Sequence, residues 1–246
     1  MITTAETITH KTTARIVGVM YLAGFVVGLG GEGLIQSNLS APNYLSMISA
    51  NSMLLAIGAL LWLIAVIGDA AHGVLMFPIL KQHSERMAIG YLAARIVDAI
   101  FIAVMVLFVL LQIPLGSEYL KAAAPDTFYL QALSTLFKQA QLYAYEIGMS
   151  ALGVSGVVLC STLYRAKLVP RWLAGWGLVG YAIIFCGMLS EIMGSGLGLA
   201  SSIPGGLWEV FIGVWLIVKG FNAAAIASEP AKTAANASDH MRLSQA

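Results

Sequence analysis

Long runs of hydrophobic residues alternate along this chain with short polar or basic segments. A helix needs about 20 apolar residues to cross the hydrocarbon core of a bilayer, and most of the runs reach that length. The pattern therefore predicts an all-α, polytopic integral membrane protein. Its six transmembrane helices are expected at about residues 14–35, 53–80, 87–115, 142–163, 173–197 and 207–221.

The segments outside these runs differ in character. Residues 44–52 resemble an interfacial helix, and the glycine-rich residues 194–206 predict a tight connection. Between residues 116 and 141, apolar side chains recur every three or four positions, which predicts a helix on the membrane surface or an extension of the fourth helix. We divide the chain into a polar N-terminal segment (1–13), a transmembrane domain (14–221) and a disordered C-terminal tail (222–246).

Composition agrees with a membrane protein. The chain is 59% hydrophobic and only 10% charged, whereas roughly a quarter of the residues of a soluble domain are charged. Its formal net charge is +1, and it has no Lys/Arg-rich tract, so nucleic acid is not an expected partner. Cys160 and Cys186 both lie in apolar runs, which favours small core residues over a disulfide or a metal site.

Basic residues are distributed unevenly between the two sides of the predicted bundle. With six helices, only Lys121 and Lys138 fall on one side, where Glu118 and Asp126 offset them. The other side, which holds both termini, carries eight basic residues. Because basic loops stay in the cytoplasm, this side is expected to be cytoplasmic, in agreement with an even number of helices. The residues on that basic side are Lys11, Arg15, Lys81, Arg86, Arg165, Lys167, Arg171 and Lys219.

Four ionisable residues lie inside the second and third runs, which fold back at residues 81–86. Asp69 and Asp98 are both roughly 18 Å of helix from that turn, and His72 and Arg95 are both about one helical turn nearer to it. The pattern predicts a polar cluster near the bilayer midplane, in which Arg95 pairs with Asp69 or Asp98. An unpaired charge at that depth would cost several kcal/mol or more. A purely structural clamp between the two helices stays open as the alternative.

Glu209 lies about 15 Å of helix before Lys219 and can complete the cluster from the sixth helix. Three carboxylates then face one arginine. At least one of them must be protonated, or neutralised by His72 or a bound cation. Asp69, His72, Arg95, Asp98 and Glu209 are therefore the predicted ligand- or proton-binding residues.

Three further acids, Glu32, Glu146 and Glu191, lie far from the basic loops, toward the other ends of the first, fourth and fifth helices. They are a weaker prediction for an outer vestibule. The simpler alternative is that each carboxylate reaches the wet membrane interface.

The familiar catalytic motifs do not fit. Ser155, between Gly153 and Gly156 on the fourth helix, resembles the serine nucleophile of rhomboid intramembrane proteases, but the sixth helix contains no histidine to act as its base. We therefore expect these small residues, with Gly148, to form a packing face. No spacing indicates a metal site or a bound cofactor, and no catalytic residue is assigned.

Blocks of residues between Thr13 and Asn222 resemble a bacterial membrane family known as domain of unknown function 4386. The blocks are residues 13–18, 77–81, 90–91 with 95–98, 168–172, and 209 with 214–222. In that family the position of Asp98 is more often glutamate. The resemblance implies a multi-pass protein of the bacterial cytoplasmic (inner) membrane and implies no activity.

Our leading hypothesis is a membrane binding or transport protein with a midplane polar site for a proton, a cation or a small amphiphile. The alternative is a non-catalytic interaction or assembly protein whose buried charges only fix helix packing. An intramembrane enzyme acting on a lipid or quinone ranks third. The expected partners are the lipid bilayer and a small-molecule or ion ligand, and a homo-oligomer stays open because the chain is short for a two-lobed transporter.

Overall fold

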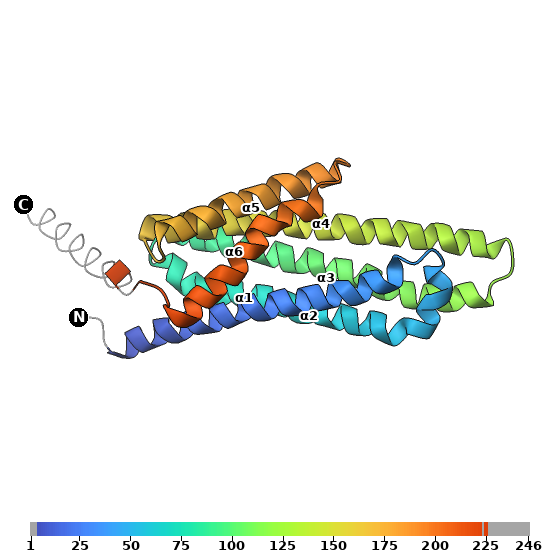
Figure 1. Cartoon of the computed structure of the whole chain (residues 1–246), viewed down its shortest axis with the longest axis horizontal. Coiled ribbons are helices and arrows are strands. Elements are labelled where there is room, and N and C mark those ends of the chain that lie inside the picture. Colours follow the sequence, from blue (N-terminus) through green and yellow to red (C-terminus); the bar gives the residue numbers. More distant parts are fainter. Residues whose placement is uncertain (1–3, 223, 226–246) are drawn as a thin grey trace, which may run out of the picture.

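The computed structural model describes residues 4–222, 224 and 225, and these residues form six helices (Figure 1). The fold is all-α, as predicted. Nearly all of the tail that we expected to be disordered lies outside the described residues. The helices are α1 (Thr4–Leu39), α2 (Tyr44–Lys81), α3 (Glu85–Lys121), α4 (Asp126–Ala166), α5 (Arg171–Ile192) and α6 (Gly198–Val218).

The helices form one elongated bundle in which neighbours in sequence are neighbours in space. Each helix packs on the next one along the chain, and α6 packs back on α1, so the six close into a ring. The α2–α3 and α4–α5 turns lie at the same end of the bundle as the start of α1 and the end of α6 (Figure 1). The α1–α2 and α3–α4 connections lie at the opposite end.

The helices differ greatly in length. α5 and α6 have 22 and 21 residues, or roughly 33 Å, whereas α4 has 41 residues, or roughly 60 Å. The α3–α4 end therefore projects well beyond the α5–α6 turn (Figure 1). Of our two predictions for the amphipathic segment 116–141, the structure agrees with an extension of the fourth helix over residues 126–141, whereas residues 116–121 continue α3.

Buried hydrogen bonds hold this projecting end together. The Ser134 hydroxyl donates to Gln112 Oε1 at 2.6 Å and lies 2.6 Å from the hydroxyl of Tyr44. The Gln112 amide donates in return to the carbonyl of Ser134 at 3.1 Å. α2 begins at Tyr44 and bends at Asn51, whose backbone is not helical, so the predicted interfacial segment is the bent first part of α2.

One predicted connection is wrong. We expected a tight loop over residues 194–206, but α6 already begins at Gly198 and contains Pro204. Tertiary packing outweighs the loop-like composition here. A Cβ atom on Gly180 would lie only 3.0 Å from the Cα of Gly205, so the two glycines let α5 and α6 pack backbone to backbone.

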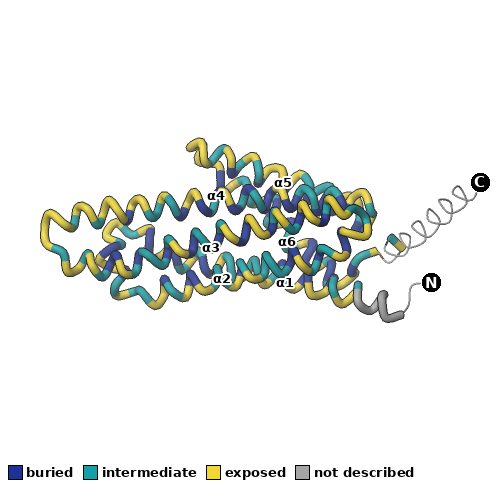
Figure 2. The backbone as a smooth tube through the Cα atoms, turned by 180° about the vertical axis from the view of Figure 1, so that it is seen from behind, coloured by how far each residue is buried: buried dark blue, intermediate teal, exposed yellow. Residues whose placement is uncertain are grey.

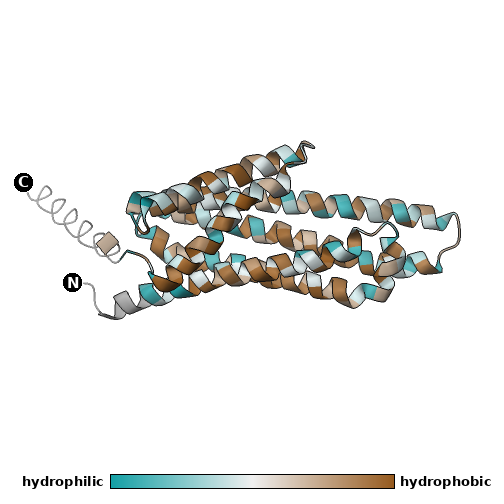
Figure 3. Ribbon diagram, in the orientation of Figure 1, coloured by the Kyte–Doolittle hydropathy of each residue, from teal (hydrophilic) through white to brown (hydrophobic). Residues whose placement is uncertain are grey.

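The helices are largely apolar along the middle of the bundle, and hydrophilic residues gather toward its ends (Figure 3). Exposed residues occur along the whole length of the helices (Figure 2), and many of them are large and apolar, such as Val26 and Ile67 at 69% exposure each. So many exposed large apolar residues are unusual for a water-soluble protein. All six described helices are long and apolar enough to cross a membrane, which is the architecture of a multi-pass membrane protein.

The interior holds two apolar cores, one near each end of the bundle. One surrounds Tyr181 and Trp208, and the other surrounds Ile48 and Val109. Small residues bring α4 close to its neighbours as predicted, since a Cβ on Gly156 would collide with the ring of Tyr181. Asp69 and His72 of α2 and Arg95 and Asp98 of α3 lie in the layer between the two cores, and Glu209 of α6 lies beside Trp208 of the first core.

Candidate functional site

A cavity of about 340 Å³ lies in that middle layer, and each of the six described helices contributes to its wall. A volume of this size is at the lower end of the range for small-molecule sites. All five residues of the predicted polar site line it: Asp69 and His72 from α2, Arg95 and Asp98 from α3, and Glu209 from α6.

Arg95 is the centre of the charged cluster. Its Nη1 atom lies 2.7 Å from Asp69 Oδ1 on the neighbouring helix and 3.7 Å from Asp98 Oδ2 one turn further along α3. The predicted pairing of Arg95 is therefore confirmed for both aspartates. The side chains of Arg95 and Asp98 are only 3% and 2% exposed, whereas that of Asp69 is 34% exposed. The cavity thus reaches the Asp69 carboxylate.

Tyr91 connects Arg95 to His72. Arg95 Nε donates to the Tyr91 hydroxyl oxygen at 3.3 Å, and His72 Nδ1 lies 2.5 Å from the same oxygen. The Tyr91 hydroxyl has one proton and two acceptor lone pairs, so the donor in the His72–Tyr91 hydrogen bond depends on the tautomer of the imidazole. His72 Nε2 is buried without a hydrogen-bond partner among the described residues.

Glu209 enters the cavity from the opposite side of the ring. Its Oε1 atom accepts a hydrogen bond of 2.7 Å from the Tyr181 hydroxyl of α5. No direct bond joins it to Arg95 within the part of the chain that the structure describes. Glu209 therefore shares the cavity with the Arg95 cluster and is not neutralised by an ion pair in it.

Aromatic rings form much of the remaining polar wall. Tyr21 packs edge-on against His72, with ring centres 4.5 Å apart, and Trp62 packs similarly against Tyr145 at 6.2 Å. Both the hydroxyl of Tyr21 and the indole N–H of Trp62 are buried without a partner in the described part of the chain. The cavity is thus bordered by aromatic rings, whose faces attract cations.

Glycines keep the cavity open. Gly24 and Gly28 of α1 and Gly68 of α2 line it. A Cβ atom on Gly24 or Gly68 would meet no atom within 4 Å, and one on Gly28 would meet only Trp62, at 3.9 Å. Larger residues at these positions would project into the space, so the small size of glycine is what preserves the volume.

The charges that line the cavity are unbalanced. Asp69, Asp98, Glu209 and, further along α1, Glu32 supply four carboxyl groups. Among the described lining residues, Arg95 alone carries a permanent positive charge. Even if His72 is counted as a cation, the four carboxyl groups outnumber the two positive side chains, and this excess of acidic groups favours a bound cation or protons.

Comparison with known proteins gives the family. The model of a family described as domain of unknown function (DUF4386) matches residues 16–220. The chain belongs to this family. Neither a curated protein nor a solved structure matches it. The family assignment agrees with the resemblance of the sequence blocks and supplies no activity, so the function of this DUF4386 protein has to be argued from its cavity.

Of the three outer glutamates, one lines the central cavity. Glu32 lines the cavity and accepts a hydrogen bond of 2.8 Å from Gln36. Glu191 accepts from the backbone N–H of Gly198 at 2.8 Å, which caps the start of α6. Glu146 is buried, and neither it nor Glu191 lines the central cavity. An outer vestibule built from all three stays an untested prediction.

Sequence reasoning missed the tyrosines of the site. Tyr91 lies four residues before Arg95, so the two share a helical face, and this spacing could have identified it. Tyr181 gives no such signal, because it reaches Glu209 from another helix. Nor did the pattern single out Gly68, whose importance depends on the space around it.

Proposed function

We propose that this protein is a membrane binding or transport protein whose central cavity takes up a small cation with an apolar body. The observation that carries the proposal is the excess of carboxyl groups in a cavity that all six described helices line. Ionisable residues within membrane-spanning helices are costly to bury, so a functional role is their default interpretation.

The cavity suits a ligand that is charged at one end and apolar at the other. Its volume of about 340 Å³ equals that of roughly 11 water molecules at about 30 Å³ each. Asp69 and Glu209 are only partly buried and can reach a positive group. Trp62, Tyr145 and Ile184 supply aromatic and apolar wall. The cationic group would lie near the two acids, with the apolar body against these side chains.

The extent of the cavity also supports transport. It follows one face of α1 from Tyr21 through Gly24 and Gly28 to Glu32, a distance of roughly 17 Å. Glu32 lies toward the α1–α2 end of the bundle, whereas the Arg95 cluster lies deeper. A cation entering past Glu32 would therefore meet carboxylates at both ends of the space.

The alternative is an interaction protein whose buried charges only fix helix packing. Its support is the Arg95–Asp69 ion pair of 2.7 Å, which joins α2 to α3 and would set their register. That interpretation explains Arg95 and its two aspartates. It gives no role to Glu209, to the open cavity or to the glycines that preserve it.

We also propose that both termini face the cytoplasm, across the inner membrane of a bacterium. The turns at the end of the bundle that holds the start of α1 carry Lys81, Arg86, Lys167 and Arg171. Basic residues are enriched on the cytoplasmic side of membrane proteins. Labelling of single cysteines placed in the α2–α3 turn of intact cells would test this orientation, since that turn should be inaccessible from outside.

The proposal can be tested with benzyltrimethylammonium, an aromatic quaternary cation, and with neopentylbenzene, its uncharged isostere. Calorimetric titration of the detergent-solubilised protein should show saturable binding of the cation and none of the neutral compound. Glu209→Gln and Asp69→Asn should each weaken binding about tenfold, the effect of losing roughly 1.4 kcal/mol. Glu118→Gln, which removes an exposed carboxylate paired with Lys121, is the matched control and should bind like the wild type.

Equal binding of the two probes would mean that the cavity is merely apolar. Loss of binding in Glu118→Gln to the same degree as in Glu209→Gln would locate the effect on the surface. Either result contradicts the proposal. Each variant's melting curve is recorded alongside, so that a folding defect is recognised separately.

A further inference from the structure

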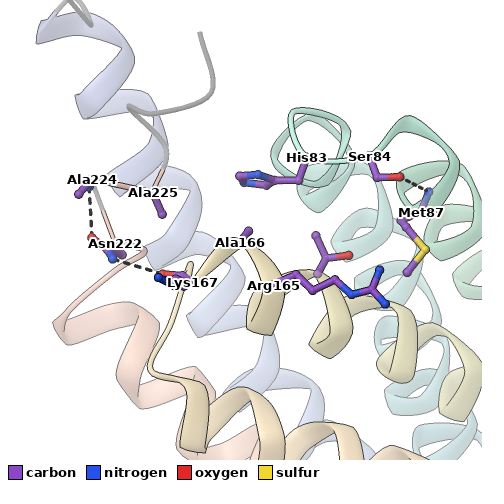
Figure 4. A pocket seen from close by; sticks show the side chains of 10 residues that line it. His83, Ser84, Met87, Arg165, Ala166, Lys167, Asn222, Ala224 and Ala225 are labelled. Atoms are coloured by element: carbon purple, nitrogen blue, oxygen red, sulfur yellow. Dashed lines mark hydrogen bonds between the residues drawn. The ribbon is translucent and has the colours of Figure 1, made fainter. Parts of the chain in front are cut away.

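A second pocket lies at the basic end of the bundle, away from the central cavity. It has a volume of about 590 Å³ and is bordered by three separate parts of the chain. His83 and Ser84 come from the α2–α3 turn, Arg165 and Lys167 from the end of α4, and Asn222 from the segment after α6. Figure 4 shows Arg165 extending toward the start of α3 and His83 directed into the space between the segments.

The pocket is strongly basic. No aspartate or glutamate is among its described lining residues. Arg165 and Lys167 form no ion pair within the part of the chain that the structure describes, whereas Lys81 and Lys121 each pair with a glutamate at 2.9 Å. Two positive side chains therefore face a common space without an internal counter-charge. A polar site of this kind favours an anion.

Hydrogen-bond donors that could bind an anion also border the pocket. Ser84 caps α3, since its side-chain oxygen accepts from Met87 N at 3.4 Å, and its hydroxyl proton stays available. The pocket thus borders the positive end of the α3 dipole, which stabilises negative charge. The planar guanidinium of Arg165 presents a fork of N–H groups, and this geometry matches the oxygens of a phosphate.

The rim of the pocket is held in place by the backbone. Lys167 adopts a left-handed conformation (φ 55°), which ends α4 and turns the chain toward α5. Asn222 bonds to this turn twice, from its backbone N–H to the Leu168 carbonyl at 2.8 Å and from its side-chain amide to the Lys167 carbonyl at 3.3 Å. The segment after α6 is therefore fixed beside the basic residues (Figure 4).

We propose that this pocket binds a phosphate group, with Arg165 and Lys167 as its main ligands. The phosphate can belong to a lipid headgroup or to a soluble phosphate ester, since both present the same oxygens. Exposed Tyr164 and Trp172 flank this end, and such aromatic residues mark the headgroup level of membrane proteins. This inference is independent of the cation proposed for the central cavity.

Two experimental arms separate the two sources. In the first, the protein is reconstituted into an equimolar mixture of phosphatidylcholine and phosphatidylglycerol, and native mass spectrometry measures which lipid stays bound. In the second, glycerol 3-phosphate is added to the protein in a nonionic detergent, and broadening of its phosphorus resonance reports binding. Retention of phosphatidylglycerol indicates a headgroup, and broadening indicates a soluble ester.

The test variant is Arg165→Gln with Lys167→Gln, and the matched control is Arg86→Gln with Lys219→Gln. Both pairs remove two positive charges from the same end, but Arg86 and Lys219 do not line this pocket. In whichever experiment shows binding by the wild type, the affinity of the test pair should be about tenfold lower, while the control pair should bind like the wild type. Absence of binding in both arms, or an equal loss in the two pairs, would overturn the proposal.

Discussion

Removal of Arg95 should destabilise the protein through one aspartate in particular. Arg95→Leu takes away the only positive charge beside Asp98, whose side chain is 2% exposed and whose Oδ2 has no hydrogen-bond donor in the described part of the chain. Asp69 loses the same partner but is 34% exposed, so cavity water can solvate it. Breaking a buried ion pair by removing one partner typically costs about 3–5 kcal/mol.

Two double variants distinguish the aspartates. Arg95→Leu with Asp98→Leu removes the buried charge together with its partner and should recover most of the lost free energy of unfolding. Arg95→Leu with Asp69→Leu leaves the buried Asp98 without an ion-pair partner and should stay about 2 kcal/mol less stable than the first pair. Both double variants also lose the Arg95–Tyr91 hydrogen bond, so the difference between their free energies of unfolding reports on the two carboxylates alone.

The assay is reversible unfolding in mixed micelles with increasing dodecyl sulfate, followed by tryptophan fluorescence and circular dichroism. If Arg95→Leu lowered the free energy of unfolding by less than about 1 kcal/mol, the cluster would be solvated and would contribute little to stability. Equal recovery in the two double variants would refute the assigned difference in burial between Asp98 and Asp69.

Other parts of the structure give further predictions. Gly68→Leu should fill part of the cavity and abolish benzyltrimethylammonium binding without lowering the melting temperature. Gly90 is also a helical glycine with open space around it, but it lies outside the cavity, so Gly90→Leu should bind normally in calorimetric titration. Tyr181→Phe removes the donor to Glu209 and should lower the free energy of unfolding by about 1–3 kcal/mol in the dodecyl sulfate assay; an unchanged value would contradict the bond. Ser134→Ala should cost a similar amount but leave cation binding unchanged, because Ser134 stabilises the projecting end and not the cavity. Lowering the pH should weaken cation binding, since protons compete for the carboxylates, and pH-independent titrations would argue against their role.

Much of the fold follows from the sequence because lipid imposes a simple rule. Backbone groups in hydrocarbon must bond within a helix, so each long apolar run becomes one helix. The pairing of Arg95 with an aspartate also followed, because Asp69 and Asp98 both lie within about one helical turn of the depth of Arg95 in the antiparallel pair of helices. The Arg95–Asp69 distance of 2.7 Å agrees with that prediction.

Features that depend on tertiary packing could not be predicted in this way. The start of α6 at Gly198 reflects the close approach of Gly180 and Gly205, and no local pattern contains that contact. The cavity is similarly non-local, because its volume depends on what surrounds Gly68 on other helices. The hydrogen bond from Tyr181 to Glu209 joins residues 28 positions apart, beyond any helical spacing.

The central claim is that a cationic group binds in the middle layer beside Asp69 and Glu209. Crystals grown with 4-bromobenzyltrimethylammonium would test it most directly, because anomalous scattering locates the bromine atom. With the ligand near the Kd of the wild type, we predict one strong peak inside the cavity, near Trp62 and Gly68, that loses most of its height in crystals of Glu209→Gln grown under the same conditions. A peak found only on the outer apolar surface, or one inside the cavity that keeps its full height in Glu209→Gln, would contradict the account.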